Sequence, residues 1–382
     1  MAEREAPSAA NIVTNVAKPA ERQSTIFTYV RDGIITGKFQ PGGRIPTIEQ
    51  LEARFGISRL TIRLALNRLR KDGFIVSRGR YGTFVRDNPP HLSNYGVVLH
   101  SASCAHWSQY DLAFLNEAGR MHMPNKRVHC YHILGGSVPP ADYRRILDDV
   151  ERNRLAGLIF TNPPRELAGT PVLEAPGIPR VFIELPKRAA GPTVYFDLKQ
   201  WRHKALRFLA AHGRRKLAFI EVALAGKAPQ AVYEAVRADA ARYGMQTCRR
   251  WVQGVSLAAP QWASALMALL IHDGPDHPDA LVINDDNLVE HVTAGLAEAG
   301  VNAPRDMDVV AHANFPWPTP GALPVTRLGF SITEALQTAI RYIDLQRQGT
   351  DAPPFTLLPA YFEDELPDSG RPVGSHERGF ER

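Results

Sequence analysis

The chain's first hydrophobic pattern has helical spacing and follows a stretch that has no such pattern. Between residues 24 and 36, apolar side chains recur every three or four positions, which predicts one buried helix face, at Ile26, Phe27, Val30 and Ile34. Ser24 is expected to cap this helix and Gly37 to end it. Residues 1–20 lack the pattern and are expected to form a disordered tail.

Two more short helices are predicted immediately afterwards. Thr47, with Gln50 three positions later, forms the signature of a capping box, and Gly56 is expected to end the helix that begins there. Ser58 is expected to cap the next helix. The apolar side chains of that helix fall at helical spacing and are expected in the core: Ile62, Ala65, Leu66 and Leu69.

The exposed side of this last predicted helix is basic. Arg59, Arg63 and Asn67 recur every four residues opposite the apolar stripe, so they are expected to project outward. Two short helices joined by a tight turn, with polar side chains on the second, are typical of a helix-turn-helix that enters the DNA major groove. Two short strand-like runs then flank Gly-Arg-Tyr-Gly at 79–82, which predicts a β-hairpin that reaches DNA as a wing.

The distribution of charge supports this interpretation. Residues 21–86 contain 13 Lys and Arg against 5 Asp and Glu, whereas the whole chain has a net charge of only +6. The 296 residues that follow carry 30 basic and 32 acidic side chains. A positive excess confined to one small segment is typical of a nucleic-acid-binding module attached to a neutral domain.

Residues 45–85, from IPTIEQ to GTFV, resemble the winged helix of the GntR family in order and spacing. The resemblance implies that Arg59, Thr61 and Arg63 are recognition-helix contacts and that the loop at 80–82 is the wing tip. Two departures, Glu49 where the family usually has arginine and the tip Gly-Arg-Tyr-Gly, bear on which operator is bound. The predicted DNA-binding residues are Thr47, Ser58, Arg59, Thr61, Arg63, Arg78, Arg80, Tyr81 and Gly82.

From Tyr95 onward, short apolar runs alternate with helix-length segments, which predicts parallel sheets covered by helices in two lobes. The expected organisation is a winged helix over 21–87, a polar linker over 88–94, a two-lobed domain over 95–365 and a flexible tail over 366–382. The fold class is therefore α/β, with an N-terminal winged helix joined to a two-lobed domain built on parallel sheets.

Five segments of the large domain resemble the effector domain of LacI-type repressors and the periplasmic sugar-binding proteins, among them PDALVINDDNLVEHVTAGLAEAG and VTRLGFSITEALQTAIRYI. The resemblance implies two lobes that close on a small, often sugar-like ligand, and homodimer contacts from the same domain. Ligands of such folds bind at the carboxyl ends of strands. The candidate effector-binding residues there are His100, Trp107, Thr161, Glu184, Asn284, Asp285 and Asn314.

Two of these candidates are expected to face the cleft from opposite lobes, namely Glu184 and Asn284. Alternatively, Glu184 pairs with Arg188, and Asn284 only caps the following helix. Asp197 is expected to cap a helix rather than to bind ligand, and Asp285 has the same alternative.

Catalytic and metal-binding patterns are weak in this sequence. It contains no GxGxxG, P-loop or GxSxG motif, so neither an enzyme nor a cofactor is predicted. The segment HDGPDHPD at 272–279 is interpreted as a loop rather than a metal site, and His100 and His106 around Cys104 as part of a ligand-facing loop. Three scattered cysteines and the absence of a long apolar run favour a cytoplasmic protein without a membrane span.

Together these patterns predict a DNA-binding transcription regulator that responds to a small sugar-like effector, acts as a repressor and binds double-stranded operator DNA as a homodimer. Two alternatives stay open at this point. One is an enzyme fused to a winged helix, and the other is a ligand-independent DNA-binding factor whose pocket is vestigial.

Overall fold

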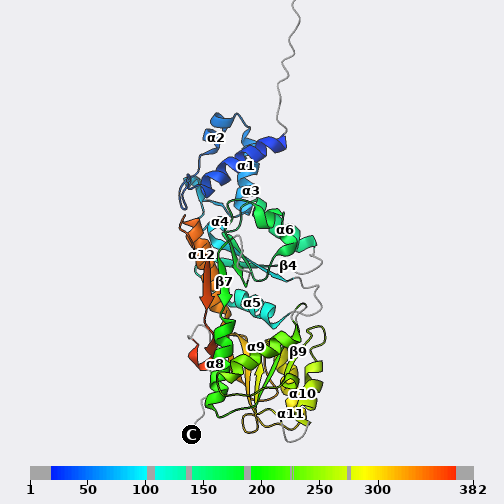
Figure 1. Cartoon of the computed structure of the whole chain (residues 1–382). Helices are drawn as coiled ribbons and strands as arrows, with labels where there is room; N and C mark the ends of the chain where they lie inside the picture. The colour runs from blue at the N-terminus through cyan, green and yellow to red at the C-terminus, as the bar shows by residue number, and fades with distance from the viewer. Residues whose placement is uncertain are drawn as a thin grey trace, which may run out of the picture. The chain divides into compact units, whose positions relative to one another are not determined.

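The computed structural model describes residues 19–100, 108–134, 140–184, 191–223, 226, 228–272 and 277–366. The chain divides into two compact units, Met1–Ser93 and Asn94–Arg382 (Figure 1). No helix in the described ranges is both long enough and apolar enough to cross a membrane.

The first unit is a small helical domain with one hairpin. Its elements are α1 (Pro19–Ile35), α2 (Ile48–Phe55), α3 (Arg59–Lys71), β1 (Ile75–Ser77), β2 (Thr83–Val85) and α4 (Pro90–Ser93). The helical stripes predicted from the sequence form its core, where Ile26, Leu51 and Ile62 are fully buried. Burial of these stripes is what holds such short helices together, because isolated helices of this length are marginal in water.

The predicted helix ends are confirmed at Thr47, Gly56 and Ser58 and wrong at Ser24. Thr47 Oγ1 and Gln50 complete a reciprocal capping box, and Ser58 caps α3 by accepting from the backbone of Thr61. Gly56 ends α2 in the left-handed region at φ 63°, which glycine adopts without strain. Ser24, expected as a cap, lies inside α1 because the helix already begins at Pro19, a residue that suits the first turn.

The stretch expected as a linker contains regular structure. Residues 90–93 form α4, whose His91 is buried and stacks on Phe74 with ring centroids 5.9 Å apart. Asn94 then begins the first strand of the second unit. Pro89 and Pro90 thus lie at the start of a helix rather than in an extended connection. The domain limits expected from the sequence stay a prediction.

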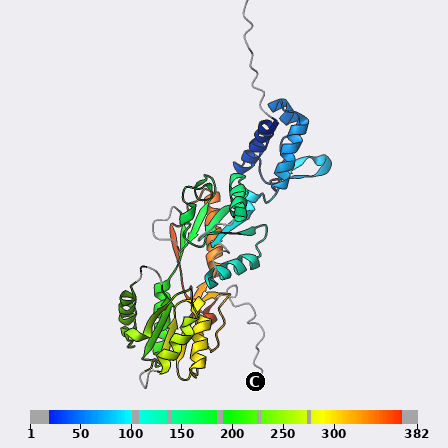
Figure 2. The same ribbon diagram turned by 90° about the vertical axis from the view of Figure 1, so that its right-hand side faces the viewer.

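The second unit consists of two lobes, each with a six-stranded sheet (Figure 2). The first lobe has the order β13-β7-β6-β5-β3-β4 with parallel pairing throughout. Its strands are β3 (Asn94–His100), β4 (Arg127–Leu134), β5 (Gly157–Phe160), β6 (Arg180–Ile183), β7 (Thr193–Phe196) and β13 (Phe355–Leu358). Helices α5 (Gln109–Arg120) and α12 (Ile332–Arg347) pack on one face, and α6 (Pro140–Glu151) and α7 (Pro171–Glu174) on the other.

The second lobe has the order β14-β12-β11-β10-β8-β9, in which only the short β14 runs antiparallel to its neighbour among the described strands. Its strands are β8 (Leu217–Val222), β9 (Val252–Val255), β10 (Ala280–Ile283), β11 (Asp308–Phe315), β12 (Thr326–Ser331) and β14 (Tyr361–Phe362). Helices α8 (Leu198–Ala211) and α9 (Pro229–Ala241) pack on one face, and α10 (Trp262–His272) and α11 (Val289–Glu298) on the other. The predicted fold class, two lobes of parallel sheet behind an N-terminal helix-turn-helix, is confirmed.

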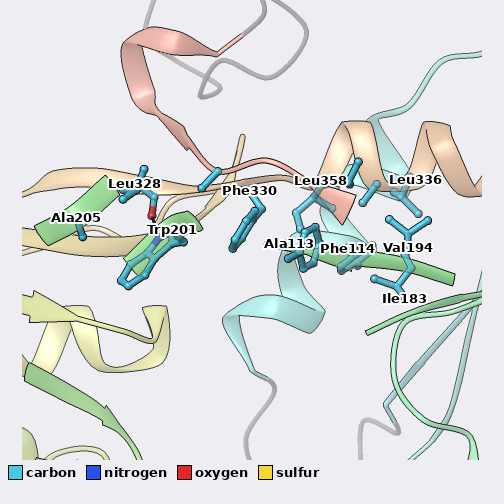
Figure 3. Packing of buried hydrophobic residues seen from close by; sticks show 14 of the residues in the cluster. Ala113, Phe114, Ile183, Val194, Trp201, Ala205, Leu328, Phe330, Leu336 and Leu358 are labelled. Carbon is cyan, nitrogen blue, oxygen red and sulfur yellow. Dashed lines mark hydrogen bonds between the residues drawn. The ribbon is translucent and has the colours of Figure 1, made fainter. Parts of the chain in front are cut away.

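The chain crosses between the lobes three times, from β7 to α8, from β12 to α12 and from β13 to β14. One hydrophobic cluster continues through this junction, and Figure 3 shows its members from Trp201 through Phe330 to Val194. Trp201 Nε1 donates to the carbonyl of Leu328 at 2.6 Å, so the large buried ring has its polar atom paired. The junction therefore positions the carboxyl ends of both sheets.

Candidate DNA interface and effector site

The outward face of α3 exposes the arginines predicted to contact DNA. Arg59 and Arg63 are exposed, and the residues that follow them, Leu60 and Leu64, are 69% and 48% exposed. Exposed leucines beside arginines on one helix suit a major groove, where apolar side chains meet thymine methyl groups. Thr61 and Ser58 share a hydroxyl–hydroxyl hydrogen bond of 3.0 Å at the start of the helix.

Two carboxylates of α2 lie against these arginines. Arg59 Nε donates to Glu52 Oε2 at 2.7 Å, and this bond raises the pKa of the Arg59 guanidinium. The pKa of Glu49 is lowered chiefly by a backbone hydrogen bond and by the Thr47 hydroxyl, with smaller effects from the charges of Arg59 and Arg63. The departure from the GntR pattern at Glu49 thus lies next to the recognition helix.

The hairpin tip is basic and exposed, as predicted. The Arg78 guanidinium lies over the Phe84 ring, 4.9 Å from its centroid, and Arg80 donates to the Tyr81 hydroxyl at 3.2 Å. Tyr81 is 63% exposed. Gly82 has φ 106°, and a Cβ there would lie 2.9 Å from Arg44 Nε, so the tip requires glycine at this position.

In the second unit, polar side chains gather at the carboxyl edge of the first lobe's sheet. Thr161 follows β5, is fully buried and donates from Oγ1 to the carbonyl of Val98 at 3.0 Å. Glu184 follows β6 in the left-handed region at φ 59°, and its Oε1 accepts the Phe196 backbone N–H at 2.5 Å. Burial raises the pKa of the Glu184 carboxyl above its ordinary value.

A second set of polar side chains occupies the carboxyl edge of the second lobe's sheet. Asn284 and Asp285 follow β10, and Asp285 Oδ1 accepts from both the backbone and the side chain of Asn287. Asn314 on β11 is 1% exposed and donates to Asp286 Oδ2 at 2.6 Å. Burial, reinforced by the negative charge of Asp285, raises the pKa of Asp286 to about 8.

A hydrogen bond joins the two edges directly. The backbone N–H of Gln109, at the start of α5 in the first lobe, donates to Asn287 Oδ1 of the second lobe at 2.8 Å. Next to Gln109, the Tyr110 hydroxyl donates to the Thr161 carbonyl at 3.0 Å. Burial raises the pKa of Tyr110 well above its ordinary value, and the negative charges of Glu184 and Asp111 add to this effect. The two lobes are therefore linked at Gln109 and Asn287, close along the chain to Tyr110, which contacts Thr161, and to Asp285.

Several of these neighbours were absent from the sequence-based prediction: Gln109, Tyr110, Asp111, Asn162, Asp286 and Asn287. Asn162 and Asp286 directly follow predicted residues at strand ends, so extending each strand-end candidate by one position finds both. Two predicted residues escape comparison, because Trp107 and the side chain of His100 lie outside the described residues, as does Arg188. In HDGPDHPD, residues 273–276 and the side chain of His272 are likewise outside them.

The second unit also contains two hollows. A cavity of about 950 Å³ is bordered by β7 and β13, with Tyr195, Phe355 and Leu357 in its wall. A smaller one of about 320 Å³ lies against α8 and includes His203, Lys204 and Tyr243. Among the described residues that line them, none was predicted from the sequence to bind effector.

Comparison with known proteins finds a family match within each unit. Residues 22–85 match the family described as bacterial regulatory proteins, gntR family, and residues 206–361 match the periplasmic binding protein-like domain. The HTH-type transcriptional regulator TauR of Rhodobacter capsulatus is 41% identical over 87 residues, which are 23% of this chain and 18% of that protein. The chain spans less than half the length of the first curated relatives that it matches.

Two further proteins resemble the chain over most of its length. The arabinose metabolism transcriptional repressor of Geobacillus stearothermophilus is 24% identical over 339 residues, 82% of this chain and 88% of that protein. A LacI family transcriptional regulator from Arthrobacter sp. FB24, solved in complex with lactose, has a TM-score of 0.52 at 17% identity, over 71% of this chain and 97% of that one. This second likeness shows the fold of the large unit.

Proposed function

We propose that this chain, which joins a GntR-family helix-turn-helix domain to a periplasmic-binding-protein-like domain, is a transcription regulator whose DNA binding responds to a small hydroxylated effector. The observation that carries the proposal is the exposed basic face of α3, with Arg59 and Arg63, beside a basic hairpin tip. A helix of this kind donates to base edges in the major groove, while a wing holds the phosphate backbone. The DNA contacts proposed are those of the nine residues predicted from the sequence.

The effector site is proposed at the facing carboxyl edges in the second unit. Glu184, Asn284 and Asp285 supply carboxylate and amide groups there, which suit sugar hydroxyls. Thr161 and Asn314 already hydrogen-bond to Val98 and Asp286, respectively. Their proposed role is therefore to stabilise the carboxyl edges of the sheets rather than to contact the ligand. The lactose complex of the Arthrobacter protein and the name of the Geobacillus repressor support a sugar-like effector.

The biological setting follows from these two sites. We propose a repressor that acts in the cytoplasm, as a homodimer on a two-fold operator. The relatives' names, which are those of regulators and repressors, support a regulator rather than an enzyme. By linkage, an effector that changes operator affinity must have its own affinity changed by the operator to the same extent.

Two experiments test the two halves of this proposal. Selection from fragments of the source genome is expected to enrich a sequence with two-fold symmetry, and equal recovery of all fragments would refute sequence-specific binding. A thermal-shift screen with glucose, lactose, cellobiose, sucrose and arabinose is expected to raise the Tm with at least one sugar, since a ligand that binds only the folded state stabilises it. An unchanged Tm with every sugar would refute the effector class.

A further inference from the structure

An exposed carboxylate reaches the first residue of the recognition helix from the helix before it. Glu52 lies on α2, and Arg59 begins α3. Arg59 Nε donates to Glu52 Oε2 at 2.7 Å, and the two side chains are 58% and 40% exposed. The pair therefore lies where α2 meets the start of α3, the helix that enters the major groove in a helix-turn-helix.

The bond to Glu52 leaves the two terminal nitrogens of the Arg59 guanidinium available for another partner. Arginine has five N–H donors in a planar fork, and the bond to Glu52 uses the one on Nε. Within the described ranges, the terminal nitrogens of Arg59 have no hydrogen-bond partner. Those two nitrogens are the donors that can bond side by side to O6 and N7 of a guanine.

We propose that Glu52 is a positioning residue that holds the guanidinium plane of Arg59 so that its terminal nitrogens face a guanine edge. This inference rests on the proposed DNA-binding function. A free arginine side chain has many rotamers and can turn to the nearest phosphate, whereas a tethered fork loses less freedom on forming two bonds. The carboxylate also repels the phosphate backbone, which disfavours contacts that carry no sequence information.

The same helix provides a matched control in Glu49. It carries the same charge, is exposed and also lies near Arg59 and Arg63. Its carboxylate is engaged by a backbone hydrogen bond and by Thr47, and none of its hydrogen bonds in the described structure goes to Arg59. Replacing Glu49 removes a negative charge from the interface without releasing the Arg59 fork.

The test is selection from randomised double-stranded DNA with the full-length protein and five variants: Arg59→Ala, Glu52→Ala, Glu52→Gln, Glu49→Ala and the double variant of Glu52 and Arg59. Arg59→Ala is expected to abolish preference at one G·C pair, at a cost of about 5- to 150-fold in affinity for that site. Glu52→Ala is expected to relax the same pair by about 2- to 10-fold. The double variant is expected to match Arg59→Ala at that pair.

Two comparisons separate positioning from charge. Glu49→Ala is expected to keep the wild-type preference at the Arg59 pair, and Glu52→Gln, which retains an acceptor oxygen, is expected to keep more of it than Glu52→Ala. Full preference at the Arg59 pair in Glu52→Ala, or equal relaxation in Glu49→Ala, would overturn the role of Glu52. If the wild-type protein enriched no sequence at all, the DNA-binding function itself would fail, and this role with it.

Discussion

At the scale of single residues, the proposed DNA contact of Arg63 is the simplest to test. It is exposed on α3, opposite the buried stripe that contains Ile62 and Leu66. Arg63→Ala is therefore expected to leave the fold intact and to weaken operator binding by about 1–3 kcal/mol, the cost of losing a bidentate base contact. Fluorescence anisotropy at one fixed salt concentration measures it, since salt alone changes such affinities strongly.

The matched control for this change is Arg237→Ala, which removes an exposed arginine from α9 in the second unit. It is expected to leave operator affinity within twofold, or about 0.4 kcal/mol. Equal affinities of Arg63→Ala and wild type would remove Arg63 from the interface.

Asp286 is a buried carboxyl of the second unit whose pKa is strongly raised. Its pKa lies at about 8 in the folded chain against 3.8 for the free side chain, because it is buried beside Asp285. Between these two values the folded chain keeps a proton that the unfolded chain has released. Stability is therefore greatest below pH 3.8 as far as this group is concerned, and is lost as the pH rises through 8.

Asp286→Asn is consequently expected to flatten this dependence, since asparagine does not ionise and can still accept from Asn314. Calorimetry at pH 5 and pH 8.5 should show a smaller fall in the Tm of the second unit than in wild type. Asp306→Asn serves as control: its pKa is lowered by Arg305 and a backbone hydrogen bond, so it is ionised throughout this range. A wild-type slope in Asp286→Asn would show that another group titrates.

How far the candidate effector residues could be predicted depends on the hydrogen bonds that form at the end of each strand. Glu184 and Asn284 were found because they directly follow apolar strands, and Asp285 because it comes one residue later. The hydrogen bond of Glu184 was not predictable, since its donor Phe196 comes from another element and only packing brings the two residues close. The partner of Asp285 is local, because Asn287 follows it by two residues. Asn314 looked like a ligand contact by position, yet its amide is spent on Asp286 inside the lobe.

At the scale of elements, helix caps were the most predictable feature because they depend on local sequence. Asp197 was predicted as a cap, and its Oδ1 accepts from the Gln200 backbone at 2.8 Å at the start of α8. Asp197→Ala is expected to destabilise the second unit by about 0.5–2 kcal/mol, while Asp197→Asn, which still caps, is expected to cost far less. Urea unfolding monitored by circular dichroism checks this, and equal losses in the two variants would deny the cap its role.

Strands were predictable where their own sequence is a clear apolar run. The apolar runs found from Tyr95 onward coincide with β3, β5, β6, β8, β10 and β11, which are parallel strands covered on both faces and rich in apolar residues. The strands β9 and β14 lie at sheet edges, where β9 reads Val-Gln-Gly-Val and β14 has two residues. Edge strands are buried on fewer sides, so their sequence pattern is weak.

At the scale of the whole molecule, the two units have separate cores. The core of the first unit comprises residues between Ile26 and Val85, and those of the second unit begin at Tyr95. A fragment spanning residues 94–382 is therefore expected to fold, to keep its sugar response and to lose DNA binding, since the basic excess lies outside it. Circular dichroism and a mobility-shift assay check these statements. Retained operator affinity in the fragment would show that the DNA contacts do not lie in the first unit.

The most direct test of the account is the dissociation constant of the full-length protein for its selected operator, measured with and without a saturating sugar that raises the Tm. The account predicts a change of about 5- to 150-fold in operator affinity, and the same factor in sugar affinity when operator DNA is present. An operator affinity that no Tm-raising sugar changes would contradict it, because the protein would then bind DNA and sugar without coupling them.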